Sequence, residues 1–212
     1  MWSRLARVLR EAGQDVFTPS LTGIGERAHL ASAAVDLATH IADVVNVLRY
    51  EDLRDVVLVG HSYGGMVVTG AADREPGRVR TLIYLDAFVP QNGQALVDLA
   101  PGIRAALPAD GWQVQPRAPQ AQGMSDAGEI AWIAARRSPQ PARTFTDPLP
   151  LEGAFRGEQV YVFCSGYSPS TFAPFAAKTR NDAAWRYHEL PTHHYPQVSM
   201  PAQTAGVLLN YA

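Results

Sequence analysis

Residues 55–70 read Asp-Val-Val-Leu-Val-Gly-His-Ser-Tyr-Gly-Gly-Met-Val-Val-Thr-Gly, and this stretch decides the fold. It begins with an apolar, β-branched run from Val56 to Val59 that has no polar alternation. Such a run is typical of a strand that is buried on both faces of a parallel sheet. After an abrupt Gly-containing turn, a helix-like apolar run extends from Met66 to Ala72.

The turn itself has the pattern Gly60-x-Ser62-x-Gly64, which is that of a nucleophile elbow. We expect residues 60 and 64 to be small because larger side chains there would collide with the neighbouring strand and helix. Ser62 would then stand exposed above the sheet, at the amino end of a helix. The helix dipole and free backbone amides favour developing negative charge at that place. The alternative is an ordinary strand-to-helix turn with a solvent-facing serine.

Composition bounds the class of protein. The 212 residues fit one domain, 1–212, and 47% hydrophobic with 18% charged residues is typical of a globular chain. A formal net charge of -2 gives no basic patch, so nucleic acid is not an expected partner. No apolar stretch approaches the length of a membrane span, and the Arg-rich first 13 residues lack the continuous apolar region of a secretory signal. We therefore expect a cytoplasmic protein. Cys164 is the single cysteine, which allows no internal disulfide.

Hydrophobic periodicity predicts strands that alternate with helices along the rest of the chain. The expected helices lie at 2–12, 35–50, 174–179 and 201–211, and the expected strands at 15–21, 80–87, 159–164 and 185–190. Residues 90–150 accumulate Pro, Gln and Ala, which indicates an inserted cap of short helices and loops, or a mobile loop. The alternation predicts an α/β fold, a mostly parallel sheet with helices on both faces.

Three stretches resemble the α/β-hydrolase superfamily: Thr-Pro-Ser-Leu-Thr-Gly at 18–23, Gly-His-Ser-Tyr-Gly-Gly at 60–65, and the strand that ends Phe-Val-Pro at 88–90. The nearest branch contains plant hydroxynitrile lyases, methyl-salicylate-type esterases and bacterial small-ester hydrolases. The resemblance covers nearly the whole chain. It implies a serine hydrolase that acts on small carboxylic esters through an acyl-enzyme, with no cofactor or metal and with a small-molecule ester as its partner.

The resemblance also assigns the remaining site residues. Its Thr-Gly-His pattern after the last strand places the base at His194 rather than at His193. The family's usual acid position falls at residues 165–168, where this sequence has no carboxylate. Asp86, at the end of the preceding strand, is the natural substitute, and the alternative is that Asp86 only caps a loop. The amide of Tyr63 is the expected oxyanion donor.

Other residues near the expected site are assigned packing, surface or pocket-lining roles rather than catalytic ones. His61, before the serine, is expected to pack behind the elbow. Arg27 and His29 are interpreted as loop surface residues, although both could reach the mouth of the site. An apolar lining is expected from the cap, where ordinary cap core is the alternative, and the four residues are Trp112, Met124, Trp132 and Phe145.

One strand of the family is missing from this sequence. In the family, a strand that ends in His-Gly precedes the first helix, and its loop supplies one of two oxyanion amides. Here the sequence opens in the helix at 2–12, so we expect the sheet to lack that strand. A late start codon or a degraded fold would explain it. We expect this form to be weakly stable or weakly active, and a form extended upstream by a strand and a loop to be more stable, unless the flanking strands close up.

Two alternatives to an esterase remain open. A lyase would use the serine and histidine as a base. The lyases of this branch use a cap lysine, whereas the single lysine of this chain, Lys178, lies outside the expected cap. The second alternative is a catalytically impaired ligand-binding protein, which the missing strand and the missing family acid favour.

Overall fold

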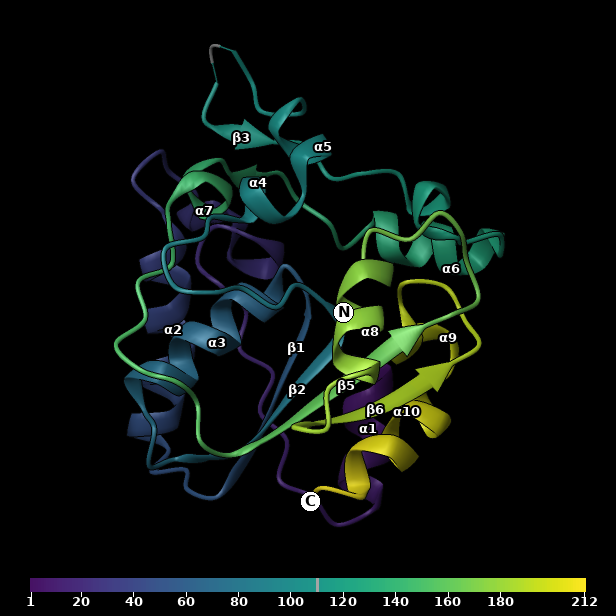
Figure 1. Ribbon diagram of the computed structural model, residues 1–212. Helices are drawn as coiled ribbons and strands as arrows, with labels where there is room; N and C mark the ends of the chain where they lie inside the picture. Colours follow the sequence, from purple (N-terminus) through teal and green to yellow (C-terminus); the bar gives the residue numbers. More distant parts are fainter. Residues whose placement is uncertain (110) are drawn as a thin grey trace.

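The computed structural model describes residues 1–109 and 111–212, and its centre is a parallel sheet of four strands (Figure 1). The strands are β1 (Val56–Ser62), β2 (Val79–Ala87), β5 (Glu158–Cys164) and β6 (Trp185–Leu190), arranged in the order β1-β2-β5-β6. The sequence predicts β2, β5 and β6 within one residue at each end, and it places the start of β1 at Val56. The prediction of a parallel α/β sheet is therefore confirmed.

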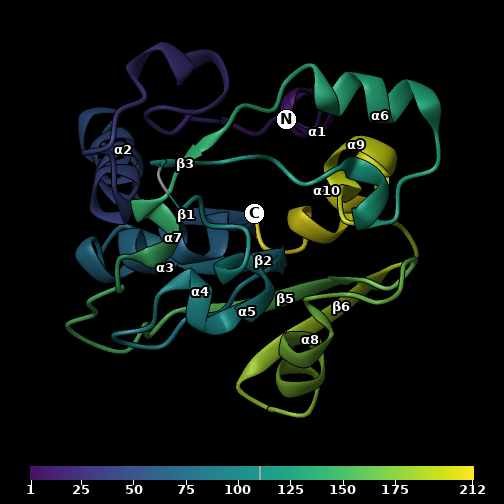
Figure 2. The ribbon, with the colours of Figure 1, turned by 90° about the horizontal axis from the view of Figure 1, so that it is seen from above.

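Helices cover both faces of this sheet. Helices α1 (Ser3–Glu11) and α10 (Pro201–Leu209) pack together on one face. Helices α2 (Leu37–Tyr50), α3 (Gly64–Arg74) and α8 (Ala173–Arg180) cover the other face. Viewed from above, α8 lies on one side of β5 and β6, and α10 lies on the opposite side (Figure 2).

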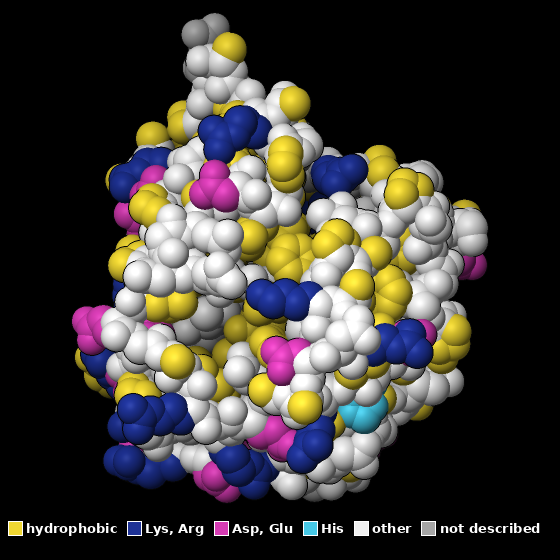
Figure 3. All heavy atoms as spheres, viewed as in Figure 1, with side chains coloured by type: hydrophobic (Ala, Val, Ile, Leu, Met, Phe, Trp, Pro, Cys, Tyr) yellow, Lys and Arg dark blue, Asp and Glu magenta, His cyan; other side chains and the backbone are white. Residues whose placement is uncertain are grey.

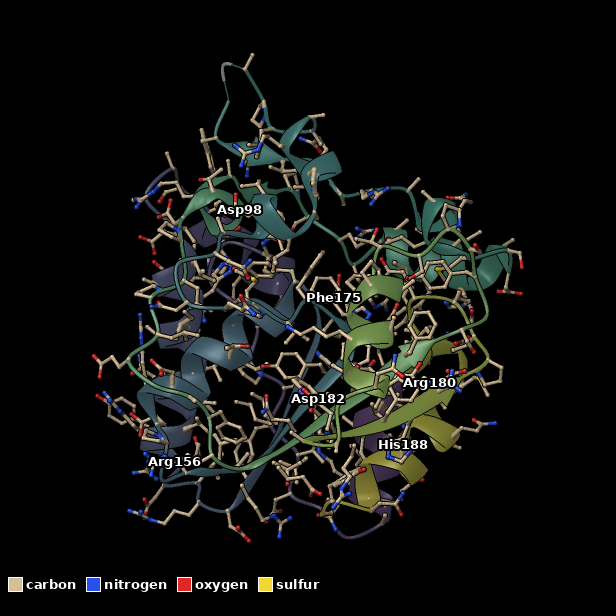
Figure 4. All side chains as sticks on the ribbon, viewed as in Figure 1. Asp98, Arg156, Phe175, Arg180, Asp182 and His188 are labelled. Atoms are coloured by element: carbon tan, nitrogen blue, oxygen red, sulfur yellow. The ribbon has the colours of Figure 1, made fainter. Side chains whose placement is uncertain are left out.

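Successive side chains of a strand point to opposite faces, and this alternation divides the core into two clusters. Phe175 of α8 packs against Phe88 on the α8 face, with ring centroids 5.7 Å apart. On the α10 face, Leu5 of α1 and Leu208 of α10 share a buried cluster with Ile83 of β2. His188 of β6 is labelled in Figure 4, and its Nε2 lies 2.6 Å from the hydroxyl of Tyr211, just after α10. The sheet thus has an apolar layer above it and another below it.

The prediction of a strand at 15–21 is wrong. Residues 14–21 carry no regular structure, and the side chain of Phe17 is 46% exposed. A strand requires a neighbour to which its backbone groups can bond, and the sheet ends at β1, which pairs with β2 alone among the described residues. The apolar residues Val16 and Phe17 produced the strand pattern without a partner strand beside them.

Between β2 and β5 lies a series of short elements. They are α4 (Leu96–Leu99), α5 (Pro101–Arg104), β3 (Gln113–Val114), η2 (Pro119–Gln122), α6 (Ala127–Ala134), β4 (Gln140–Pro141) and α7 (Arg143–Thr146). Strands β3 and β4 form a small antiparallel pair. Two further short helices are η1 (Gly25–Leu30), before α2, and α9 (Pro196–Ser199), before α10. In the part of the chain that the structure describes, no helix combines the length and the apolar character that a membrane crossing requires.

Candidate active site

Ser62 occupies the sharp turn between β1 and α3. Its φ angle of +56° lies in the left-handed region, which a non-glycine residue adopts only where the surrounding structure imposes it. As the elbow pattern predicts, position 60 has room only for glycine. A Cβ there would lie 2.6 Å from Cγ2 of Val68 and 2.7 Å from the carbonyl oxygen of Gly64.

The steric reason expected for Gly64 is wrong. A Cβ at Gly64 would meet nothing within 4 Å, whereas a Cβ at Gly65 would lie 2.0 Å from the carbonyl oxygen of Phe88. The close approach therefore occurs one residue later than the Gly-x-Ser-x-Gly pattern suggests. It joins the first turn of α3 to the chain that leaves β2.

His194 lies in the loop after β6 and is almost completely buried, with 1% of its surface exposed. Its Nδ1 atom lies 2.7 Å from Oδ2 of Asp86. Nε2 has no hydrogen-bond partner among the described residues. The ring of Phe172 stacks on the imidazole at a centroid distance of 4.8 Å and an interplanar angle of 7°. The imidazole is thus fixed at one nitrogen and along one face, and its second nitrogen is free to accept a proton.

Asp86 ends β2 in a left-handed conformation, with φ of +43° and no exposed surface. Its Oδ1 accepts a hydrogen bond from the amide of Cys164 at 3.2 Å, and its Oδ2 accepts one from the hydroxyl of Tyr167 at 2.9 Å. Burial raises the pKa of Asp86, and these two donors oppose the rise because they stabilise the carboxylate. The last residue of β5 and the loop that follows it therefore supply hydrogen-bond donors to the carboxyl group at the end of β2.

Burial lowers the pKa of His194, and the positive charges of Arg137 and Arg117 lower it further. The imidazole is consequently neutral at neutral pH, the form in which Nε2 can act as a base. His61 packs against it, with ring centroids 4.4 Å apart, and its Nε2 lies 2.6 Å from the carbonyl oxygen of His194. His61 therefore lies against His194, and its contact with the carbonyl oxygen of His194 helps to hold the backbone of that loop.

His193 points to a different partner. Its Nε2 lies 3.1 Å from Oε2 of Glu129 on α6, and its Nδ1 accepts a hydrogen bond from the amide of Tyr195. Both ring nitrogens are therefore engaged outside the site. Of the two neighbouring histidines, only His194 lies beside Asp86.

Tyr63 follows Ser62 and is the N-cap residue of α3. No described residue accepts a hydrogen bond from its amide. Its hydroxyl lies 2.9 Å from Nδ1 of His40, and Nε2 of His40 lies 2.8 Å from the carbonyl oxygen of Thr22. A neutral His40 that donates from Nε2 and accepts at Nδ1 satisfies both contacts. The orientation of Tyr63 is thereby tied to α2.

The serine and the histidine line a common cavity of about 1880 Å³. Its lining includes the apolar side chains of Phe88, Ile103 and Phe145 together with the polar side chains of Arg117 and Gln122. A second cavity of about 510 Å³ also reaches Ser62 and is lined by Tyr167 and Phe172. Apolar side chains gather in a hollow between the lobe of α4 and α5 and helix α8 (Figure 3). The cavities that reach Ser62 thus combine apolar side chains with a few polar ones, as small-molecule sites do.

Of the four cap residues expected to line the pocket, only one lines this cavity. Phe145 lines it, whereas Trp112, Met124 and Trp132 lie elsewhere. Met124 packs with Ile133 in a separate small core, and Trp132 lies against the guanidinium groups of Arg4 and Arg136. Trp112 is 38% exposed, and its carbonyl oxygen accepts a hydrogen bond from Ala142. Hydrophobic composition alone does not reveal which cap side chains face the serine.

Arg27 and His29, in the loop before α2, do not line either cavity. Arg27 forms an ion pair with Asp43 of α2 at 3.1 Å, and His29 is exposed. The interpretation of both as loop surface residues fits this placement.

Sequence reasoning missed three residues that shape the site: Tyr167, Phe172 and His40. Tyr167 stands within 165–168, where the family resemblance calls for an acid, so its position was a usable signal. Phe172 and His40 reach the site from α8 and α2, and no local pattern marks them. Within the described residues there is no group of three or more His, Cys, Asp or Glu side chains that would suit a metal ion.

Residues 1–207 match the alpha/beta hydrolase family. The chain is also 39% identical over 218 aligned positions to a carbendazim hydrolyzing esterase from Nocardioides sp., and the match covers 96% of this chain and 90% of that protein. An alpha-hydroxynitrile lyase from Arabidopsis thaliana is 29% identical, but over 43% of this chain and 36% of its own length. The match to an esterase over nearly the whole chain confirms the prediction of a carboxylic ester hydrolase.

Solved structures agree in fold. An extracellular alpha/beta-hydrolase from a Paenibacillus species superposes with a TM-score of 0.83 at 20% identity, over 100% of this chain and 93% of its own. A pyrethroid hydrolase superposes with a TM-score of 0.76 at 21% identity, over 99% and 90% of the two chains. The nucleophile-elbow sequence, the parallel sheet and the family match over residues 1–207 agree, and the chain belongs to the alpha/beta hydrolase family.

Proposed function

We propose that Ser62, His194 and Asp86 form the catalytic triad of a serine esterase that hydrolyses small carboxylic esters. The observation that supports this most directly is the 2.7 Å contact between His194 and Asp86, which leaves Nε2 of His194 without a partner in the cavity that Ser62 also lines. A serine hydroxyl needs such a base, because it is a weak nucleophile while it holds its proton.

In the first half of the reaction, Ser62 Oγ attacks the ester carbonyl carbon and Nε2 of His194 takes the hydroxyl proton. Asp86 at Nδ1 stabilises the imidazolium that forms. The amide of Tyr63, at the amino end of α3, donates to the developing oxyanion. The intermediate collapses when the C–O bond to the alcohol breaks, and the alcohol leaves with the proton from His194.

In the second half, water attacks the acyl-enzyme while His194 removes its proton. The carboxylic acid leaves, and the proton returns to Ser62 Oγ. The neutral form of His194, which burial favours, is the form needed at the start of each half.

The apolar side chains of the cavity support a small ester with an apolar acyl or aryl group. Phe88, Ile103 and Phe145 line the same cavity as the serine and supply apolar surface for such a group. The relative from Nocardioides is named for carbendazim, so carbendazim is a reasonable member of a substrate panel.

The lyase and the ligand-binding alternatives have less support. Lys178 is exposed on α8, which is not part of the 90–150 region, so it is unsuited to the role of a cap lysine beside the serine. The absence of the family acid favoured a ligand-binding protein. The position of Asp86 beside His194 weakens that argument, while the missing strand, its other ground, is unaffected.

Turnover of p-nitrophenyl acetate and butyrate tests the proposal, with an early burst of p-nitrophenol as the sign of an acyl-enzyme. His194→Ala should lower kcat/KM by about 10²–10⁴-fold. His193→Ala is the matched control and should stay near the parent value, because His193 pairs with Glu129 outside the site. The reverse ranking of the two variants, or no turnover by the parent protein, would contradict the proposal.

A further inference from the structure

Arg117 lies between β3 and η2, and it lines both of the cavities that reach Ser62. In the part of the chain that the structure describes, no carboxylate forms an ion pair with its guanidinium group. The smaller cavity, of about 510 Å³, has no Asp or Glu among its described lining residues. Because arginine stays charged at any ordinary pH, the lining beside the serine includes a cation that no described carboxylate balances.

A second guanidinium group, that of Arg137, lines the larger cavity. Its Nη1 donates to the carbonyl oxygen of Arg117 and, at 3.2 Å, to Oε1 of Gln122. The residue is half-buried, and its guanidinium also forms no ion pair with a described carboxylate. Arg137 therefore holds the backbone of Arg117 in place, and it adds a second positive charge to the same cavity.

The segment that carries these arginines is attached to the histidine loop. The carbonyl oxygen of Gln122 accepts a hydrogen bond from the amide of His194 at 3.2 Å, and Oε1 of Gln122 accepts one from the hydroxyl of Tyr195 at 2.5 Å. Burial lowers the pKa of His194, and the charges of Arg137 and Arg117 add to this effect. The two arginines therefore lie near enough to the proposed base for their charges to act on it.

The chemistry of these residues defines what the cavity can hold besides the ester group. The planar fork of a guanidinium matches the two oxygens of a carboxylate. Arg137 already donates to two oxygens of the protein, so the fork of Arg117 is the one that can receive a single carboxylate. Phe88 and Ile103 line both cavities and supply apolar surface between that fork and Ser62. A fitting molecule has an ester group at one end, a short apolar chain and a carboxylate at the other end.

We propose that Arg117 binds the free carboxylate of a dicarboxylic acid monoester while the ester carbonyl of the same molecule lies at Ser62. This assignment rests on the proposed esterase function and names the class of substrate for that site. The reaction is the same hydrolysis: water adds across the ester C–O bond, and the products are a dicarboxylic acid and an alcohol. Arg117 is thus a specificity residue, and Arg137 is a positioning residue that acts through it.

A pair of esters that differ in one group tests the assignment. The monomethyl ester of glutaric acid carries a carboxylate, and its carboxamide analogue has the same size without the charge. The corresponding pairs from succinic and adipic acid vary the chain length, and release of methanol measures kcat/KM for all of them. For the chain length that fits best, the parent should prefer the carboxylate by about 10-fold. Added KCl should reduce this preference, because salt screens the interaction between charges.

Variants of the cap arginine assign the preference to one residue. Arg117→Gln should remove most of it, chiefly through a higher KM for the carboxylate ester, because the contact is present before and during the reaction. Arg117→Lys keeps the charge and should retain part of the preference. Arg74→Gln is the matched control, because it removes the same charge from an exposed position on α3 that lines neither cavity. It should show the preference of the parent.

Binding to Ser62→Ala, measured by isothermal titration calorimetry, tests recognition without turnover. This variant should bind the monomethyl ester of glutaric acid more tightly than the carboxamide analogue. Equal binding of the two, or an unchanged preference in Arg117→Gln, would overturn the assignment of Arg117. Turnover of neutral p-nitrophenyl acetate separates the two proposals. If the parent hydrolyses it but shows no preference for a carboxylate, this inference alone fails, whereas no turnover of any ester would contradict the esterase function and this inference with it.

Discussion

Nδ1 of His194 lies 2.7 Å from Oδ2 of Asp86, although 108 residues separate the two along the chain. The contact joins the end of β2 to the loop after β6, two strands away in the sheet. It fixes Nδ1 as the nitrogen of His194 that carries the proton, so Nε2 is left without a proton and can accept one.

Asp86→Asn tests whether this contact matters for the reaction. An amide at this position does not stabilise the imidazolium and favours the wrong tautomer, so kcat should fall by roughly 10²–10⁴-fold while the fold is kept. Ester turnover is the measurement, and circular dichroism checks the fold. Unchanged turnover would leave Asp86 with a structural role and the site with a serine–histidine pair.

Tyr167→Phe should change the pH dependence of activity. The Tyr167 hydroxyl donates to Asp86 at 2.9 Å and lowers the pKa of that carboxyl, which burial otherwise raises. Without the hydroxyl, the pKa of Asp86 should rise further, and the carboxylate should be lost at a higher pH. The acid limb of kcat/KM should therefore move to higher pH in the variant. Ser170→Ala is the control, because Ser170 touches Tyr167 but not Asp86. Identical profiles for all three proteins would contradict a positioning role for Tyr167.

Replacement of Gly64 and of Gly65 by alanine should change the free energy of unfolding by very different amounts. A Cβ at Gly65 would lie 2.0 Å from the carbonyl oxygen of Phe88, so Gly65→Ala should destabilise the protein by about 1–3 kcal/mol or more. Gly64→Ala has open space and should stay within about 1 kcal/mol of the parent. Urea denaturation measures both. Equal effects would mean that the close approach at Gly65 is not present in solution.

His40 should make the protein less stable as pH falls. The side chain has no exposed surface, and burial lowers the pKa of His40 below the value of about 6.5 in an unfolded chain. Below about pH 6.5 the unfolded state therefore binds a proton that the folded state does not. The free energy of unfolding should fall by up to about 1.4 kcal/mol per pH unit from this group.

The comparison of parent and His40→Gln isolates this effect. Burial also lowers the pKa of His61 and His194 and raises that of Asp86, and these contributions are common to both proteins. Urea denaturation between pH 7.5 and 5.5 should give a shallower decline for the variant. Parallel declines would show that His40 does not titrate in this way.

The sequence predicted the elements whose signals are local and strongly periodic. The apolar run 56–59 gave β1, and the spacing of Leu37, Ile41, Val44 and Leu48 gave α2. The strand expected at 15–21 failed because a strand depends on a neighbour, and no local pattern reports whether a neighbour is present. The same limit explains Gly65, whose crowding comes from Phe88, 23 positions further along the chain.

Within the candidate site, too, the sequence predicted the residues with local signals and missed those that depend on distant contacts. Ser62 stands within a short motif, and His194 and Asp86 follow strand ends, so the order of elements was enough to suggest them. Met124 and Trp132 have the composition of a pocket wall but pack into other contacts, because the path of the cap decides which side chains face the serine. Tyr167 contributes a hydrogen bond to Asp86, which the sequence does not display.

The central claim, that Ser62 is the nucleophile, is tested most directly by a fluorophosphonate probe and mass spectrometry of the labelled protein. The account predicts one adduct per chain on the peptide that contains Ser62, and no adduct in Ser62→Ala. Labelling of Ser62→Ala at the parent level, or an adduct on another residue of the parent, would contradict it.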